Sequence, residues 1–247
     1  MKVFDIFKTI QGEGLFSGCP TTFIRFAGCS LACKGCDTTP SWKAENKLLV
    51  QGKQVDRVSV QAIVDSVIAI DPFPKHICIT GGEPLEQRNE KLAQLVLELL
   101  REFYLKTDVK IVIETGGHCS LSKFIDLVGR IHYLPMEKFF DPVRFSVDFK
   151  TPSTGRHERM LWSNYTGLRR TDLIKFVCSD LDDFQWSLAT LKKLQLSGIR
   201  TNVLFHSMGG QPDKWLAQEI LETDWEWAAP FFDVRYGVQI HKLLGVA

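Results

Sequence analysis

Short apolar segments alternate along the chain with longer amphipathic ones, and this alternation restricts the possible folds more than any other feature. Several short segments are continuous apolar runs, which are typical of strands covered on both faces. The predicted strands span residues 3–8, 21–27, 76–80, 109–114, 144–149, 172–178, 200–205 and 235–241. The predicted helices span 88–103, 120–129, 181–197 and 212–222. Strands that alternate with helices predict an α/β fold with a parallel sheet.

The number of strand–helix units limits the architecture further. About six such units are too few for a closed eight-stranded barrel, so we expect a partial, open β/α barrel. No Pro/Gly/Ser-rich linker divides the chain, which predicts a single domain over residues 1–247. The segments near 38–75 and 131–143 are too long for ordinary connections and are predicted to be insertions.

Composition excludes several classes of protein. With 45% hydrophobic residues the chain can bury a sizeable core, and 30 basic against 29 acidic residues supply no overall field for nucleic acid or an anionic membrane. No apolar run reaches the ~18–20 residues that a membrane span needs, and the first residues lack a signal-peptide pattern. We therefore expect a cytoplasmic protein that binds neither nucleic acid nor membrane.

Three of the seven cysteines form a tight group in the sequence CSLACKGCD, as Cys29, Cys33 and Cys36. Composition alone would produce such a triplet with a frequency of roughly 0.006, and an odd, clustered set of thiols is no disulfide framework. Three thiolates at this spacing suit a metal centre. One alternative is zinc, with His76 or Cys78 recruited as the fourth ligand. The other is a four-iron cluster whose fourth iron stays open.

The triplet follows a predicted strand, and the next strand ends in Gly81-Gly82-Glu83-Pro84. A CxxxCxxC loop at this place, followed by a Gly-Gly-Glu-Pro element, resembles the radical S-adenosylmethionine (SAM) superfamily. The resemblance implies a [4Fe-4S] cluster with three Cys ligands. SAM chelates the open iron, and its one-electron cleavage gives a radical that abstracts hydrogen from the substrate.

Further segments resemble one family within this superfamily, the 7-carboxy-7-deazaguanine synthases. They are QGEG at 11–14, Cys36-Asp37-Thr38, VDFKTPSTG at 147–155, IKFV at 174–177 and RYGVQIHKLL at 235–244. The resemblance implies a carbon–nitrogen lyase that converts 6-carboxy-5,6,7,8-tetrahydropterin into 7-carboxy-7-deazaguanine and ammonia, regenerates SAM, depends on Mg²⁺ and serves queuosine or deazapurine biosynthesis.

The resemblance also implies a set of site residues. The cluster ligands are Cys29, Cys33 and Cys36, and Thr38 contacts magnesium. The residues implied in SAM binding are Gly35, Cys36, Asp37, Gly82, Glu83, Glu114, Asp148 and Lys150. The residues implied in substrate binding are Ile10, Gln11, Gly12, Glu13, Arg25, Thr80, Gln239, His241 and Lys242.

Local sequence leaves structural roles open for some of these residues. Thr38 is also a reasonable helix N-cap, Glu114 a charge before the next helix, and His241-Lys242 a solvated strand end. Arg25 is different, because an arginine within an apolar strand must find a partner, and its planar fork suits a carboxylate.

The resemblance implies two protein partners, a second copy in a homodimer and a flavodoxin- or ferredoxin-type electron donor. Two other functions remain as alternatives. One is a radical SAM activase of a glycyl-radical enzyme, which would bind a protein loop in place of a pterin. The other is a protein that binds zinc or an iron–sulfur cluster without catalysis.

Overall fold

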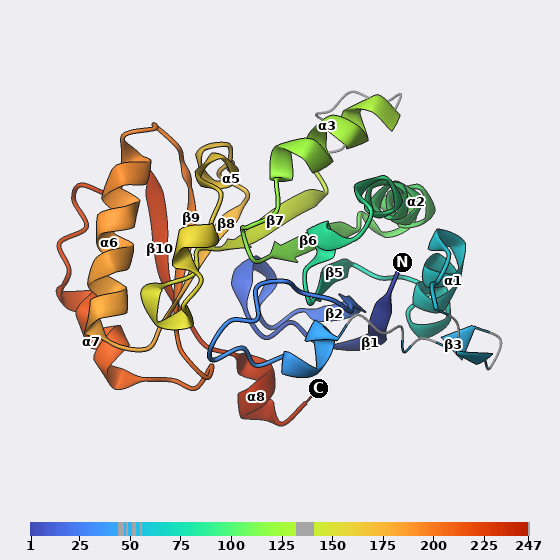
Figure 1. Cartoon of the computed structure of the whole chain (residues 1–247), viewed down its shortest axis with the longest axis horizontal. Coiled ribbons are helices and arrows are strands. Elements are labelled where there is room, and N and C mark those ends of the chain that lie inside the picture. The colour runs from blue at the N-terminus through green and yellow to red at the C-terminus, as the bar shows by residue number, and fades with distance from the viewer. Residues whose placement is uncertain (44–46, 48, 51–52, 55, 132–140, 247) are drawn as a thin grey trace.

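One large, open sheet organises the molecule in the computed structural model, which describes all residues except 44–46, 48, 51–52, 55, 132–140 and 247 (Figure 1). Its eight strands lie in the order β1-β2-β5-β6-β7-β8-β9-β10. They are β1 (Val3–Ile10), β2 (Pro20–Phe26), β5 (His76–Gly81), β6 (Lys110–Thr115), β7 (Val143–Asp148), β8 (Leu173–Cys178), β9 (Thr201–Ser207) and β10 (Phe232–Gly237). The sheet does not close, which confirms the predicted partial barrel.

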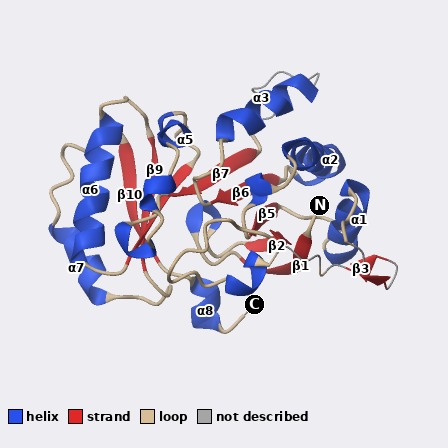
Figure 2. Cartoon of the chain, viewed as in Figure 1, coloured by secondary structure: helices blue, strands red, loops and turns tan. Residues whose placement is uncertain are grey.

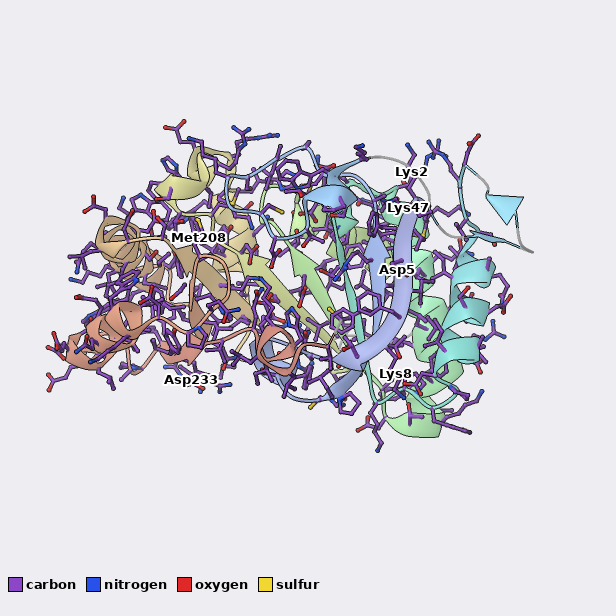
Figure 3. All side chains as sticks on the ribbon, turned by 90° about the horizontal axis from the view of Figure 1, so that it is seen from below. Lys2, Asp5, Lys8, Lys47, Met208 and Asp233 are labelled. Carbon is purple, nitrogen blue, oxygen red and sulfur yellow. The ribbon has the colours of Figure 1, made fainter. Side chains whose placement is uncertain are left out.

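All neighbouring strands from β2 to β10 are parallel, and only β1 runs antiparallel to its neighbour. The reason is the length of the connection. Only residues 11–19 separate β1 from β2, and a parallel crossover needs a dozen or more residues. Lys2, Asp5 and Lys8 mark the course of β1 along this edge of the sheet (Figure 3).

The main helices surround the sheet on its outer side (Figure 2). They are α1 (Val60–Ile70), α2 (Asn89–Thr107), α3 (Leu121–Ile131), α6 (Leu181–Gln195) and α7 (Lys214–Glu222), and two short ones are α5 (Trp162–Thr166) and α8 (Ile240–Leu244). Caps define several starts: Asp180 accepts from the amide of Asp183 at α6, and Asp213 accepts from that of Trp215 at α7. Among the described residues, no helix is long and apolar enough to cross a membrane.

Strand side chains and the inner faces of the helices form one core. Phe149 stacks on Tyr165 and Phe176 with ring centroids 4.1 and 5.7 Å apart, just beyond the end of β7. Cys78 and Cys178 are fully buried in β5 and β8, and burial raises the pKa of each thiol, that of Cys178 to about 12. Their place in the core makes them packing residues and argues against Cys78 as a fourth zinc ligand.

The structure differs from the predicted elements in two places. Residues 60–70 form a helix within the stretch expected to be an irregular insertion, beside a two-stranded ribbon of β3 (Leu49–Val50) and β4 (Lys53–Gln54). The last strand was predicted over 235–241, but β10 begins at Phe232 and ends at Gly237, so His241 lies in a helix. Most of the insertion predicted near 131–143 lies outside the described residues.

Helix α8 has a particular place in this architecture. It follows β10, the last strand of the sheet, and packs near β1 at the opposite edge. The amide of Ile240 donates to the carbonyl of Gly12, just beyond β1, at 2.9 Å. The short helix therefore spans the gap between the two open edges of the partial barrel (Figure 1).

Candidate active site

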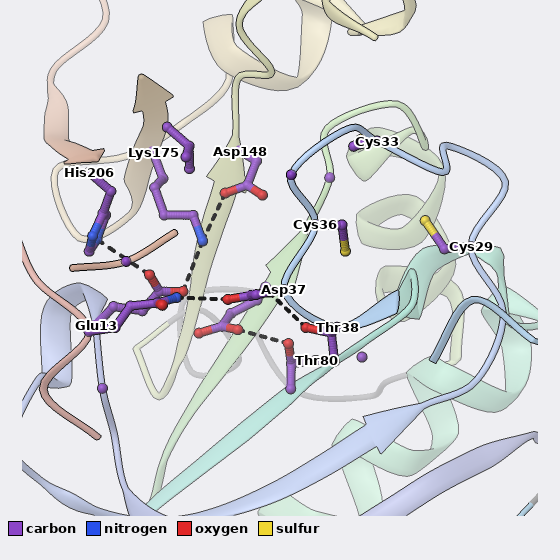
Figure 4. Close-up of a pocket in the computed structure, with 18 of the residues that line it drawn as sticks. Glu13, Cys29, Cys33, Cys36, Asp37, Thr38, Thr80, Asp148, Lys175 and His206 are labelled. Atoms are coloured by element: carbon purple, nitrogen blue, oxygen red, sulfur yellow. Dashed lines mark hydrogen bonds and ion pairs between the residues drawn. The ribbon is translucent and has the colours of Figure 1, made fainter. Parts of the chain in front are cut away.

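A cavity of about 250 Å³ opens at the carboxyl ends of the parallel strands. Loops at these strand ends converge in β/α folds and commonly carry active sites. Of the site residues inferred from the sequence, all except Glu83 and Lys242 line this one cavity. Figure 4 shows the three cysteines on one side and a group of charged side chains on the other.

The cysteine triplet lies in the loop that follows β2. All three thiols are free, and burial raises the pKa of Cys29 and Cys33 above the ordinary value. The Sγ of Cys36 accepts a hydrogen bond from the indole Nε1 of Trp42 at 3.3 Å. Three free thiols from one loop, facing one cavity, fit an iron–sulfur cluster that keeps one iron open on the cavity side.

Gly81 and Gly82 bring the end of β5 close to the start of this loop. A Cβ on Gly81 would lie 2.3 Å from the backbone of Phe26, and one on Gly82 would lie 2.0 Å from the carbonyl oxygen of Gly28. Gly81 also has φ +131°, which only glycine adopts readily. The two glycines therefore serve a backbone-to-backbone contact.

Glu83 is nearly inaccessible, at 1% exposure, and its side chain is used within the protein. The carboxylate accepts from the Thr115 hydroxyl at 2.7 Å and from the Gly116 amide at 2.7 Å. Burial raises its pKa above the usual value despite these bonds. The side chain ties β5 to β6 under the cavity, so any contact of this residue with a ligand would use its backbone.

Asp37 and Thr38 follow the last cysteine and meet residues from the other end of the sequence. The Thr38 hydroxyl donates to Asp37 Oδ1 at 2.9 Å, and Gln239 Nε2 donates to Asp37 Oδ2 at 3.0 Å. Burial raises the pKa of Asp37, but the hydrogen bonds from Gln239 and Thr38, together with the charges of Lys175 and Lys242, bring it below its usual value, so this carboxyl is ionised. Lys242 lies 3.4 Å from the same oxygen. Thr38 does occupy the N-cap position of the 3-10 helix Thr39–Trp42, as the structural alternative expects, but its side chain makes no capping hydrogen bond.

Glu114 lies near the end of β6 and joins two predicted substrate residues. Its carboxylate accepts from Gln11 Nε2 at 3.2 Å and from the Thr80 hydroxyl at 2.8 Å. Burial and the neighbouring Glu13 carboxylate raise the pKa of Glu114. The side chain is therefore directed at the cavity and does not cap the next helix.

A half-buried chain of charged side chains lines one part of the cavity. Lys175 Nζ lies 2.9 Å from Glu13 Oε1 and 3.0 Å from Asp148 Oδ1, and Asp148 also pairs with Lys150. His206 Nε2 lies 3.3 Å from the other oxygen of Glu13. Burial lowers the pKa of Lys175, but the two carboxylates raise it well above its usual value, so Lys175 is charged.

The sequence reasoning missed Lys175 and His206 as site residues. Lys175 was noted only within the IKFV segment, yet it breaks an apolar strand as Arg25 does, and the same signal could have identified it. His206 near the end of the fully buried strand β9 gives a similar signal. Lys150 lies beyond the end of β7, but its ammonium still reaches Asp148.

Arg25 projects from β2 into the cavity. Its guanidinium carbon lies 4.9 Å from the ring centroid of Phe7 on β1. It makes no hydrogen bond or ion pair with any residue that the structure describes. A positioned but unpaired guanidinium in a cavity is suited to a carboxylate ligand.

Residues near the C-terminal end of the sequence complete the wall beside Gly12. A Cβ on Gly12 would lie 1.7 Å from His241 Nδ1, and one on Gly210 would lie 1.8 Å from Gln239 Oε1. Both glycines leave room for these side chains, which line the cavity. The predicted C-terminal residues are thus brought to the predicted N-terminal segment.

Comparison with known proteins agrees with this geometry. The family model of the 4Fe-4S single cluster domain matches residues 10–139. The 7-carboxy-7-deazaguanine synthase of Clostridium acetobutylicum is 31% identical over 98% of this chain and 95% of its own length. The synthase of Methanospirillum hungatei is 30% identical over 100% of this chain and 86% of its own length.

Among solved structures, the crystal structure of QueE from Escherichia coli superposes with a TM-score of 0.62. The alignment covers 96% of this chain and 93% of that one at 21% sequence identity, which supports the fold. Together with the full-length sequence matches and the cysteine loop at the cavity, these findings place the chain in the 7-carboxy-7-deazaguanine synthase family.

Proposed function

We propose that this chain is a radical SAM carbon–nitrogen lyase that converts 6-carboxy-5,6,7,8-tetrahydropterin into 7-carboxy-7-deazaguanine and ammonia, in queuosine or deazapurine biosynthesis. The observation that carries the proposal is the placement of an unpaired Arg25 in the same cavity as three free thiols. A flat heterocycle that bears a carboxylate matches this pairing of a guanidinium with a metal-binding loop.

Cys29, Cys33 and Cys36 would hold the [4Fe-4S] cluster. When bound, the cluster supplies the electron for reductive cleavage of SAM. SAM would lie against Gly35, Asp37, Gly82 and the backbone of Glu83, with Glu114, Asp148 and Lys150 offering polar contacts. Leu31, a buried residue of the cysteine loop that lines the cavity, would help to keep water from the reacting atoms.

Arg25 would bind the substrate carboxylate through its fork, and the stacking of Arg25 on Phe7 would fix its plane. Glu13 would accept from the guanidine-like edge of the pterin, with Ile10, Gln11 and Gly12 beside it. Thr80, Gln239, His241 and Lys242 would close the remaining sides. The contacts of Lys175 and His206 with Glu13 would keep that carboxylate ionised and oriented.

Thr38 would contribute one oxygen to a magnesium ion that takes most of its other ligands from substrate and water, as Mg²⁺ commonly does. Its hydrogen bond to the ionised Asp37 orients the hydroxyl oxygen and adds negative charge nearby. Both features favour a cation at this end of the cavity.

The remaining proposals concern the protein as a whole. We treat residues 1–247 as one domain with insertions near 38–75 and 131–143, because all eight main strands belong to one sheet. We also propose a cytoplasmic homodimer that receives electrons from a flavodoxin- or ferredoxin-type donor.

The test is an anaerobic assay of reconstituted protein with SAM, dithionite, Mg²⁺ and 6-carboxytetrahydropterin, with product identified by mass spectrometry. We expect 7-carboxy-7-deazaguanine without net consumption of SAM. Only 5′-deoxyadenosine would mean that the cluster is right and the substrate wrong, which favours the activase alternative. Colourless protein with stoichiometric zinc would overturn the enzyme proposal.

A further inference from the structure

Two arginine side chains from a separate segment hydrogen-bond to the backbone between the first two cysteines. Arg156 Nε donates to the carbonyl of Leu31, and Arg156 Nη2 lies 3.4 Å from the carbonyl of Ala32. Arg159 Nη1 donates to the carbonyl of Ser30 at 3.0 Å. Three consecutive carbonyls between Cys29 and Cys33 are therefore held by two guanidinium groups.

Ala32 adopts a backbone conformation that needs such support. Its φ is +47°, and it is one of only two non-glycine residues with positive φ in the described part of the chain. This left-handed conformation is unfavourable for alanine and persists where surrounding contacts enforce it. The contacts made by Arg156 fall on Ala32 and on the residue before it, so they act where the strain lies.

The segment that carries the two arginines is itself firmly anchored. It comprises two short 3-10 helices, Pro152–Thr154 and His157–Arg159. The Thr151 hydroxyl donates to the carbonyl of Val177 at 2.7 Å, and the Ser153 amide donates to Asp183 Oδ1 at 3.1 Å. The segment is thus fixed to β8 and α6 and gives the arginines a rigid base.

The cluster loop is also held on the opposite side. The Ser30 amide donates to both carboxylate oxygens of Glu86, at 2.9 and 3.1 Å. Burial raises the pKa of Glu86, but hydrogen bonds from His118 and Ser30 lower it to about 2, so the carboxylate stays charged. With amide and carbonyls of the loop both engaged, the backbone between the two cysteines has little freedom.

We propose that Arg156 and Arg159 are positioning residues that hold Ser30–Ala32 in the strained conformation in which Cys29, Cys33 and Cys36 line one cavity, before any cluster is bound. The inference rests on the proposed iron–sulfur function of the triplet. It adds that the loop is preorganised by a distant part of the chain and is not shaped by the metal alone.

The first test compares wild type with R156Q/R159Q. In apo-protein, Cys33 is buried at 9% exposure, and its alkylation by iodoacetamide, read by peptide mass spectrometry, should speed up about tenfold in the variant. In reconstituted protein under anaerobic conditions, EDTA should bleach the visible iron–sulfur absorption about tenfold faster. Arg101→Gln, which removes an arginine with an 85% exposed side chain on α2, is the matched control and should change neither rate.

The second test removes the backbone strain at Ala32 by substituting glycine. Glycine populates the left-handed region without penalty, so Ala32→Gly in the R156Q/R159Q background should restore most of the cluster retention. In the wild-type background it should have little effect. Arg156→Lys keeps the charge but loses the fork, and we expect it to resemble Arg156→Gln more than wild type.

The outcomes separate this inference from the proposed function. Wild-type rates in R156Q/R159Q, or no rescue by Ala32→Gly, would overturn the positioning role while leaving the enzyme proposal intact. If R156Q/R159Q does not fold, Arg156→Lys alone, with and without Ala32→Gly, decides the same question. A wild-type protein that takes up no cluster would overturn the proposed function itself.

Discussion

The two halves of the cavity are built by different means. The half with the cysteines is fixed through the backbone. Glycines allow close contacts between main chains, and arginine side chains donate hydrogen bonds to main-chain carbonyls. The half with Glu13 is fixed by buried side-chain charges, in which Lys175 bridges carboxylates from two segments. The first half comes mainly from one loop, and the second is assembled from several strands.

Because the two halves are held differently, we expect substitutions in them to have different effects on the protein. A backbone-held loop tolerates changes of its own side chains, except at its ligands and at the closely packed glycines, because the bonds that shape it use its main-chain atoms. A buried charge network fails when one member is removed, because the partner is left charged and desolvated. The following predictions test this contrast, in order of decreasing effect.

Removal of one thiol should abolish function without unfolding the protein. We expect Cys33→Ala to lose the cluster and all SAM cleavage, while circular dichroism stays that of wild type. Iron content and visible absorption measure the loss. Cys178→Ala, which removes a buried thiol from the core, should keep the cluster at a cost of about 1 kcal/mol in unfolding free energy. Full cluster occupancy in Cys33→Ala would refute the ligand assignment.

Removal of the bridging charge should destabilise the fold itself. Lys175→Met leaves Glu13 and Asp148 without their shared partner, so we expect a loss of about 3–5 kcal/mol in unfolding free energy, measured by urea denaturation of apo-protein. Lys193→Met, at an exposed position of α6, is the control and should change stability by less than about 0.5 kcal/mol. A similarly small change in unfolding free energy for Lys175→Met would show that the charge network does not stabilise the half of the cavity that contains Glu13.

Arg25 lies in the second half of the cavity but carries no internal bond, so its change should affect binding and leave stability intact. We expect Arg25→Lys to raise the KM for the pterin about tenfold, because the bidentate geometry is lost, with a much smaller effect on kcat. Unfolding free energy should stay within about 0.5 kcal/mol of wild type. An unchanged KM would be inconsistent with contact between Arg25 and the carboxylate.

The network should also give the apo-protein a pH dependence. Burial lowers the pKa of His206 below its usual value, and the nearby Glu13 only partly offsets this. The unfolded state therefore binds more protons than the folded state as the pH falls below the usual value of ~6.5, so stability is full above that pH and declines below it. The slope contributed by one proton is at most ~1.4 kcal/mol per pH unit.

We expect His206→Asn to flatten the stability profile of apo-protein between about pH 6.5 and pH 5. Chemical denaturation at several pH values measures this slope. An equal slope in wild type and variant would exclude His206 as its source.

The smallest effect is expected at the magnesium position. Thr38→Ala should raise the Mg²⁺ concentration needed for half-maximal activity several-fold and leave iron content unchanged. Thr38→Ser keeps the hydroxyl and is the matched control. If alanine and serine gave the same Mg²⁺ response, Thr38 would not contact the ion.

The half of the cavity with the cysteines could be predicted from the sequence, because its ligands are close together in the chain: Cys29, Cys33 and Cys36 fall within one loop. The parallel strands were equally readable, since burial on both faces produces continuous apolar runs. The charge network was harder, because the contact between Lys175 and Glu13 joins residues 162 positions apart, and only the fold brings them together.

Helix α1 was missed for a different reason. Val60, Ile63, Val64 and Val67 form one buried face at helical spacing, but β-branched residues weaken helix propensity and blur the pattern. The true end of β10 was also not predictable, since the helical turn that holds His241 depends on its contact with Gly12. Both elements are decided by packing more than by local preference.

The position of α8, between the two edges of the sheet, has a consequence for the order in which the pocket forms during translation. Asp37 and Lys242, which meet at the cavity, are 205 positions apart, so the ribosome completes the cysteine loop long before it makes the residues that close the pocket. A nascent chain that has been made as far as α6 can therefore hold its thiols in place while the substrate side is still open. Until residues 240–244 have been made, the side of the pocket beside Gly12 lacks its last wall.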